Sequence, residues 1–212
     1  MAPHDDEPLA NRLPTILGGV LATLAIVVAG LWVSGRTGLP TPEAVLSMAR
    51  PLGHPDTTGP VYAIGDSVLL GARPCLKDTI VASNAHENRT IYEGADLVER
   101  KAADGSLPPR VVVALGTNGP FGFKPLDRLM TAAGPDRSVY WVTTELPDVP
   151  QYGYEEQVNQ KLRAMPGRWP NAHVIDWNAS VAADTLYPDG IHLNPQGCQY
   201  YANLVLEGVN KA

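Results

Sequence analysis

The chain has 212 residues, enough for one domain of about 150 residues with an appended segment. Its 16 Lys and Arg residues against 22 Asp and Glu give a net charge of −6, and no basic cluster occurs in the sequence, so nucleic acid is not an expected partner. The 20 Gly and 20 Pro residues indicate many turns rather than disorder, because apolar segments separate them.

The N-terminal part predicts one transmembrane anchor. A short polar, acidic tail at residues 1–12 is followed by residues 13–35, which carry no charged side chain. As a helix rising about 1.5 Å per residue, this run reaches roughly 35 Å and would cross a hydrocarbon core of about 30 Å. The alternative is a cleaved signal peptide, since Val27 and Ala29 fit a small-residue cleavage site. The acidic tail and the length of the apolar run favour the uncleaved anchor.

A linker rich in Pro and Gly at residues 36–59 precedes a predicted catalytic domain at residues 60–212. In this domain, five apolar runs rich in β-branched residues alternate with segments of helical periodicity, which argues for a parallel sheet covered on both faces, a three-layer α/β/α sandwich. The expected strands are residues 61–64, 79–82, 111–115, 139–142 and 173–175. The expected helices are residues 68–76, 93–103, 125–133, 154–165 and 195–209.

A serine stands at the first predicted strand-to-helix junction. Gly65 and Asp66 end the first strand, and Ser67 opens an apolar segment with helical character. In an open α/β sheet such a junction lies at the carboxyl edge of the strands, where ligand crevices form. A serine hydroxyl is a weak nucleophile without a base, and its plain alternative role is a helix N-cap.

The C-terminal part supplies a base and a carboxylate. Asp189 and His192 are three residues apart in a short segment before the last predicted helix. With Ser67 they would make a nucleophile, a general base and a residue that orients the base. The alternative is that Asp189 begins an ordinary Asp-Gly turn and His192 is a surface loop residue.

Three motifs in order resemble the first, third and fifth sequence blocks of the GDSL/SGNH hydrolase family: Gly65-Asp66-Ser67-Val68, Gly116-Thr117-Asn118 and Asp189-Gly190-Ile191-His192. The similarity covers about residues 60–212 and looks greatest to the extracytoplasmic SGNH domains of membrane acyltransferases that O-acetylate cell-wall glycans. It implies a flavodoxin-like five-stranded sheet, a triad of Ser67, His192 and Asp189, and no cofactor.

The resemblance also implies an oxyanion hole made by the backbone N–H of Ser67 and the side chain of Asn118. The alternative for Asn118 is a position in a tight turn, because Asn and Gly tolerate left-handed backbone angles. The family's second block usually adds a glycine N–H. Here Asn88 or Arg89 occupies that place, with Gly94 further along.

The two cysteines, Cys75 and Cys198, follow Ser67 and His192 on the next helices. If Ser67 and His192 meet, these helices start close together and a disulfide becomes geometrically reasonable in an oxidising compartment. Two buried free thiols are the alternative.

The leading hypothesis is a membrane-anchored serine esterase or O-acyltransferase that acts on ester-linked acyl groups, above all acetyl groups, of carbohydrate outside the cytoplasm. As a transferase it would depend on another membrane protein as acyl donor. The alternatives are a lipase- or thioesterase-type SGNH hydrolase, and a non-catalytic module that binds a glycan or a protein.

Overall fold

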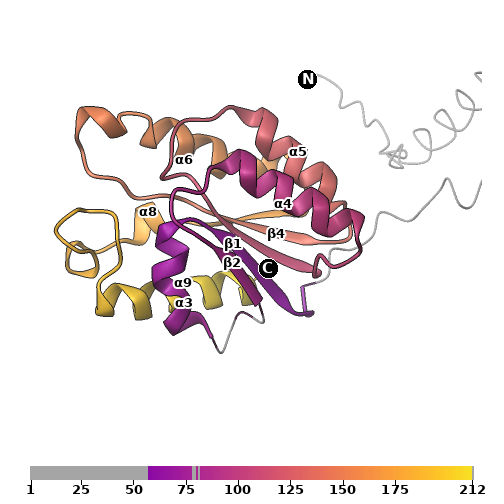
Figure 1. Cartoon of the computed structure of the whole chain (residues 1–212), viewed down its shortest axis with the longest axis horizontal. Helices are drawn as coiled ribbons and strands as arrows, with labels where there is room; N and C mark the ends of the chain where they lie inside the picture. The colour runs from indigo at the N-terminus through magenta and orange to yellow at the C-terminus, as the bar shows by residue number, and fades with distance from the viewer. Residues whose placement is uncertain (1–56, 78–79, 81, 212) are drawn as a thin grey trace, which may run out of the picture. The chain divides into compact units, whose positions relative to one another are not determined.

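The computed structural model describes residues 57–77, 80 and 82–211 (Figure 1). Five parallel strands form one sheet in the order β2-β1-β3-β4-β5. Their bounds are β1 Val61–Gly65, β2 Ala82–Ala85, β3 Arg110–Ala114, β4 Ser138–Val142 and β5 Ala172–Ile175. This order is the flavodoxin-like one, so the predicted parallel sheet and its topology are confirmed.

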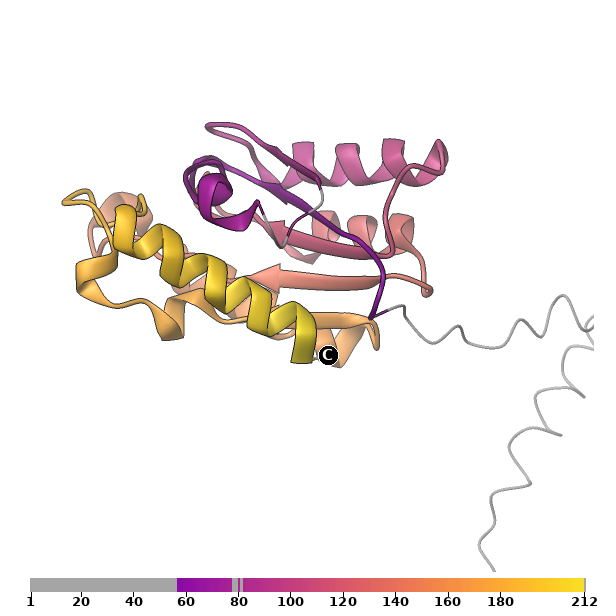
Figure 2. The same cartoon turned by 90° about the horizontal axis from the view of Figure 1, so that it is seen from below.

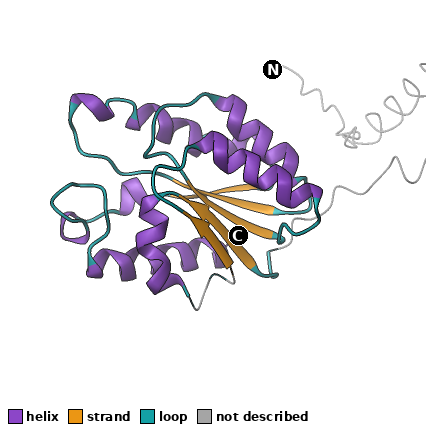
Figure 3. Ribbon diagram, viewed as in Figure 1, coloured by secondary structure: helices purple, strands orange, loops and turns teal. Residues whose placement is uncertain are grey.

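Helices cover both faces of the sheet (Figures 1 and 3). Their bounds are α3 Ser67–Leu76, α4 Ile91–Ala103, α5 Phe123–Ala133, α6 Glu155–Arg163, α7 Met165–Arg168, α8 Trp177–Ser180 and α9 Pro195–Lys211, with short 3-10 helices η1 Pro150–Tyr152 and η2 Ala183–Thr185. The predicted helix at 154–165 is divided into α6 and α7, and the other predicted helices are present.

Two hydrophobic clusters form the core, one on each face of the sheet. One joins α4, α5 and α6 to the sheet, and the other joins α3, α8 and α9 to it. Figure 2, seen from below, places α9 in front of the sheet. Strands β1 and β4 are buried at every position, which explains why their sequences are apolar without alternation.

The second strand lies further along the chain than predicted, at Ala82–Ala85 rather than 79–82. Ile80, which made the earlier run look like a strand, donates its N–H to the Leu76 carbonyl at 2.9 Å and is buried beside α3. The strand itself reads Ala-Ser-Asn-Ala and lies at the edge of the sheet. Backbone pairing with β1, rather than a run of apolar side chains, therefore defines it.

Among residues 57–77, 80 and 82–211, no helix has the length and hydropathy required to cross a bilayer. The predicted anchor at residues 13–35, the tail at 1–12 and almost all of the linker at 36–59 lie outside the described residues.

Candidate active site

The turn after β1 presents Ser67 at the carboxyl edge of the sheet. A Cβ atom on Gly65 would lie 2.3 Å from Leu69 Cβ, so glycine is needed for α3 to fold back this closely on the strand. Asp66 is the N-cap of α3 and accepts a hydrogen bond from the Val68 N–H at 3.0 Å. Because Asp66 fills the cap, the alternative role of Ser67 as N-cap is wrong, and its hydroxyl is left for another partner.

That partner is His192. His192 Nε2 lies 3.0 Å from Ser67 Oγ, and His192 Nδ1 lies 2.8 Å from Asp189 Oδ2. A proton on Nδ1 that is donated to the carboxylate leaves Nε2 free to accept the serine proton. The structure thus brings together all three residues that the sequence singled out, in the order required of a nucleophile, a base and an orienting carboxylate.

A compact turn fixes the His192 ring. Asp189 Oδ1 accepts the backbone N–H groups of Ile191 at 2.9 Å and His192 at 3.0 Å, while its other oxygen holds the ring. Gly190 lies between them with φ at 70°, where a side chain would be strained. Desolvation raises the pKa of Asp189, but these hydrogen bonds outweigh it and bring that pKa down to about 2. The carboxyl is therefore ionised whenever the histidine can act as a base.

Asn118 lies on the loop after β3, and this loop is tied directly to the turn of the serine. Thr117 Oγ1 donates to Asp66 Oδ2 at 2.6 Å. Asn118 Nδ2 donates to the Arg89 carbonyl and to Thr117 Oγ1, both at 3.1 Å. The predicted oxyanion donor is therefore at the same edge as Ser67, and the structure pairs its amide with protein acceptors. The ends of β1 and β3 flank the point where the strand order reverses, the usual ligand position in such sheets.

In the second block, Asn88 has the conformation that glycine would adopt. Its φ is 58°, and it is the one non-glycine residue with positive φ in the described part of the chain. Asn tolerates this region better than most residues, so the loop can turn here without a glycine. Arg89, the next residue, is only 5% exposed. Sequence reasoning did not anticipate a buried arginine here. The available signal was a cationic residue directly before the capping box of α4, which Thr90 and Glu93 form.

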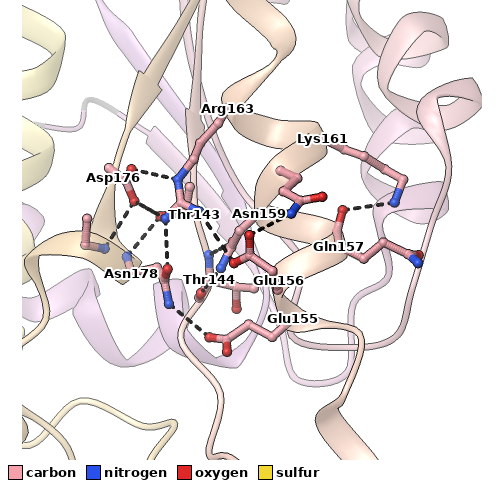
Figure 4. A network of polar contacts seen from close by, with 12 residues as sticks. Thr143, Thr144, Glu155, Glu156, Gln157, Asn159, Lys161, Arg163, Asp176 and Asn178 are labelled. Atoms are coloured by element: carbon pink, nitrogen blue, oxygen red, sulfur yellow. Dashed lines mark hydrogen bonds and ion pairs between the residues drawn. The ribbon is translucent and has the colours of Figure 1, made fainter.

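A second polar network lies at the ends of β4 and β5 (Figure 4). The Asp176 carboxylate accepts hydrogen bonds from Thr143 Oγ1 at 2.9 Å and from Arg163 Nε at 2.8 Å. The fully buried Asn159 closes a two-way contact with the Thr144 backbone, accepting its N–H at 2.9 Å and donating to its carbonyl at 2.8 Å. These contacts fix the chain as it leaves the two strands.

The second network also supports the turn that carries His192. Leu146 donates its N–H to Glu155 Oε1 at 2.8 Å, which fastens the segment after β4 to α6. On this segment, Pro147 lies so close to Gly190 that a Cβ atom on the glycine would be 3.3 Å from Pro147 Cβ. The His192 turn therefore packs against Pro147 in addition to its internal hydrogen bonds.

Cys75 on α3 and Cys198 on α9 form a disulfide, with their Cα atoms 5.9 Å apart. Of the two alternatives, the structure therefore has the disulfide and not two free thiols. The bond links the helix that starts at Ser67 to the helix that follows His192. It joins the two halves of the candidate site at a sequence separation of 123 residues.

Comparison with known proteins agrees with this fold. Peptidoglycan O-acetyltransferase OatA of Listeria monocytogenes is 30% identical over 153 residues, which are 70% of this chain and 24% of that protein. The catalytic domain of the OatA of Streptococcus pneumoniae, solved with a methylsulfonyl adduct, superposes with a TM-score of 0.65 at 22% identity, over 72% of this chain and 93% of that one. A family 3 carbohydrate esterase of Clostridium thermocellum gives a TM-score of 0.58 at 14% identity, over 72% and 96% of the two chains. No family model matches the sequence.

The chain is a relative of the peptidoglycan O-acetyltransferases and has the fold of the SGNH hydrolases. The resemblance read from the three motifs is thereby confirmed. The chain spans about a quarter of the length of the curated relatives that it matches. Relatives and structural neighbours together support an SGNH-type hydrolase or O-acetyltransferase.

Proposed function

We propose that the protein is a serine esterase or O-acyltransferase that acts on ester-linked acyl groups, above all acetyl groups, of carbohydrate outside the cytoplasm. Ser67 is the nucleophile, His192 the general base and Asp189 the residue that orients it. The observation that carries the proposal is the continuous hydrogen-bond chain from Ser67 Oγ through the His192 ring to Asp189. A serine that serves only as a helix cap would need no such chain.

The geometry supports a two-step acyl transfer. Ser67 Oγ attacks the ester carbonyl carbon while His192 Nε2 takes the hydroxyl proton, and the carbonyl oxygen becomes an oxyanion. The backbone N–H of Ser67 and the amide of Asn118 stabilise that oxyanion. When the tetrahedral intermediate collapses, the bond to the leaving alkoxide breaks and His192 returns the proton to it, leaving an acyl-Ser67 ester. Water or a sugar hydroxyl, deprotonated by His192, then takes the acyl group.

Carbohydrate as the substrate class is supported by the relatives and by the exposure of the site. The side chains of His192 and Asp189 are 45% and 47% exposed, so a bulky acceptor can approach them. The proteins matched include a peptidoglycan O-acetyltransferase and a carbohydrate esterase. Whether water or sugar completes the reaction depends on which is better placed in the second step.

An extracytoplasmic location is supported by the disulfide, because such bonds persist in oxidising compartments. We propose that residues 13–35 anchor the domain to the membrane and residues 36–59 hold it off the surface. If the protein is a transferase, a second membrane protein supplies the acyl donor.

Mass spectrometry of the intact protein after brief exposure to an activated acetyl ester tests the proposal. We expect one acetyl adduct on Ser67 and none on Ser67→Ala. Faster decay of the adduct with sugar acceptors would indicate a transferase, and decay indifferent to them an esterase. A folded protein with neither adduct nor turnover would refute the enzymatic function and leave a binding module.

A further inference from the structure

Arg89 is a buried cation at the candidate site. Its side chain reaches from the loop after β2 to the last residue of β1 and the next-to-last residue of β2. Arg89 Nη1 donates to the Gly65 carbonyl at 3.3 Å and to the Asn84 carbonyl, and Nη2 donates to Asn84 Oδ1 at 2.5 Å. Arg89 Nε donates to His86 Nε2 at 3.1 Å. The guanidinium therefore joins the end of β1, directly before the serine turn, to the end of β2 and to its own loop.

All of these acceptors are neutral. The His86 ring accepts from Arg89 at Nε2 and lies 2.7 Å from the Glu87 carbonyl at Nδ1, which assigns its proton to Nδ1. Within the described part of the chain, no carboxylate makes an ion pair with Arg89. Buried charges are ordinarily paired, because an unpaired one loses hydration without a compensating partner. Electrostatic attraction from Glu93 and Asp66 offsets part of the cost of burying Arg89. The cost that remains calls for a functional reason.

The backbone of Arg89 contacts the predicted oxyanion donor, Asn118. Its carbonyl accepts the hydrogen bond from Asn118 Nδ2 at 3.1 Å. We propose that Arg89 is a positioning residue for acylation, whose guanidinium fixes the 86–90 loop against the ends of β1 and β2, and whose carbonyl thereby orients the Asn118 amide toward the oxyanion. This inference rests on the proposed acyl transfer and adds to it a residue that none of the three motifs contains.

The physical requirement is preorganisation. An oxyanion donor helps only if it already points at the place where charge develops, since reorienting it during the reaction cancels the gain. Both N–H groups of Asn118 Nδ2 have acceptors in the structure, the Arg89 carbonyl and Thr117 Oγ1. The Arg89 carbonyl fixes the first N–H, so the second is already directed and exchanges Thr117 Oγ1 for the oxyanion without a turn of the side chain. The buried positive charge on the same loop adds to the stabilisation of a developing negative charge, because water does not screen it fully.

Arg110 provides a matched control. It also donates to backbone carbonyls, that of Gly59 at 2.6 Å and that of Val209 at 3.2 Å, and none of the ion pairs of the described residues includes it. It lies at the first residue of β3, at the opposite edge of the sheet from Ser67. Arg110→Met thus removes the same kind of carbonyl contact away from the chemistry.

The test is a double-mutant cycle on the full chain, with the acylation rate of Ser67 by an activated acetyl ester as the readout. We expect Arg89→Met to slow acylation by about 10- to 100-fold, as misplacing a catalytic group does, with a smaller change in KM. In the Asn118→Ala background the same substitution should cost less than about 3-fold, because residues that act through one another are not additive. Arg110→Met should leave the acylation rate of the folded protein unchanged.

Arg89→Lys, which keeps the charge but not the fork of donors, covers the case in which Arg89→Met does not fold. We expect Arg89→Lys to be slowed as well and to show the same loss of effect in the Asn118→Ala background. Full acylation rates in both Arg89 variants, or losses that multiply with that of Asn118→Ala, would overturn the proposal. A wild-type protein that is not acylated at all would overturn the proposed function too, so the two failures are distinguishable.

Discussion

Two arginines lie at the carboxyl edge of the same sheet, and they differ in the partners of their guanidinium groups. Arg163 lies by β4 and β5, and its Nε and Nη2 meet both oxygens of Asp176, at 2.8 and 2.9 Å (Figure 4). Arg89 lies by β1 and β2 and meets only carbonyl, amide and imidazole acceptors. The positive charge of Arg163 is balanced by this ion pair, and the pairing lowers the pKa of Asp176. Arg89 makes no ion pair in the described part of the chain, although Glu93 and Asp66 interact with it electrostatically.

This contrast distinguishes a network that holds the strand ends in place from a site that we propose takes part in the reaction. A bidentate ion pair gives a fixed geometry without a net field, which suits a network that only holds the ends of two strands. A site that must stabilise a developing anion gains from positive charge and from donors that are not already matched by carboxylates. Substitutions at the ends of β1 and β3 and in the His192 turn should therefore change rates, and those in the network of Arg163, Asp176 and Asn159 should change stability.

The largest effect expected is on the rate. His192→Ala should slow acylation of Ser67 by about 10⁴-fold or more, and combining it with Asp189→Ala should add little, because members of a triad act as a unit. Stopped-flow acylation by an activated ester measures this. Arg163→Met is the control from the other region, and it should acylate at the wild-type rate per folded molecule. Comparable losses in both variants would break the division between the regions.

Removing the disulfide tests the link between the two halves of the site. The pair Cys75→Ser and Cys198→Ser opens a loop with a separation of 123 residues. It should lower the free energy of unfolding by up to about 5 kcal/mol if chain entropy dominates. Urea unfolding with and without reductant gives the value. Detection of two titratable thiols in the denatured, non-reduced protein would show that the bond is absent.

Asn118→Ala should keep the nucleophile but lose one oxyanion donor. The rate of acylation should fall by about 10²- to 10³-fold, with the midpoint of thermal unfolding near that of the wild type. Steady-state kinetics on a small acetyl ester and calorimetry measure the two effects. A loss of stability without a loss of rate would assign Asn118 to a tight turn instead.

Asn159→Ala should have the reverse effect. It leaves the Thr144 N–H and carbonyl without their side-chain partner inside the protein, which should cost about 3 kcal/mol of folding free energy. The acylation rate of the folded protein should change less than about 3-fold, within what ordinary structural adjustment produces. Gln157→Ala, an exposed position on the same helix, is the matched control and should be neutral in both measurements.

The smallest effect concerns pH. The pKa of Asp189 falls from 3.8 to about 2 on folding, so ionised Asp189 stabilises the folded state above pH 4, and this contribution is lost as the pH falls toward 2. Wild type should therefore be more stable than Asp189→Asn at pH 6, and the gap should shrink between about pH 4 and pH 2. Denaturant unfolding at several pH values follows the gap. If the difference in stability does not depend on pH, the hydrogen bonds of the Asp189 side chain stabilise the turn and its charge does not.

The sequence alone determined what depends on neighbours along the chain. Buried central strands such as β4 are continuous apolar runs, and turn-forming residues separate them from helices, so the alternation and the sheet type were predictable. Ser67, Asp189 and His192 were recognisable because their motifs are short and local. The edge strand β2 escaped this reasoning, since Ser83 and Asn84 follow no apolar pattern and only pairing with β1 makes them a strand.

Only the tertiary structure decided the contacts between distant segments. Whether Ser67 meets His192, 125 residues away, and whether Cys75 pairs with Cys198 were open in the sequence, because no local pattern encodes a distance between two loops. The same holds for Arg89, which looks like a solvated residue until its guanidinium is found at the end of β1, 24 residues back in the chain. Burial gives an ordinary arginine its role here, and burial is a property of the packed sheet and not of the residues beside it.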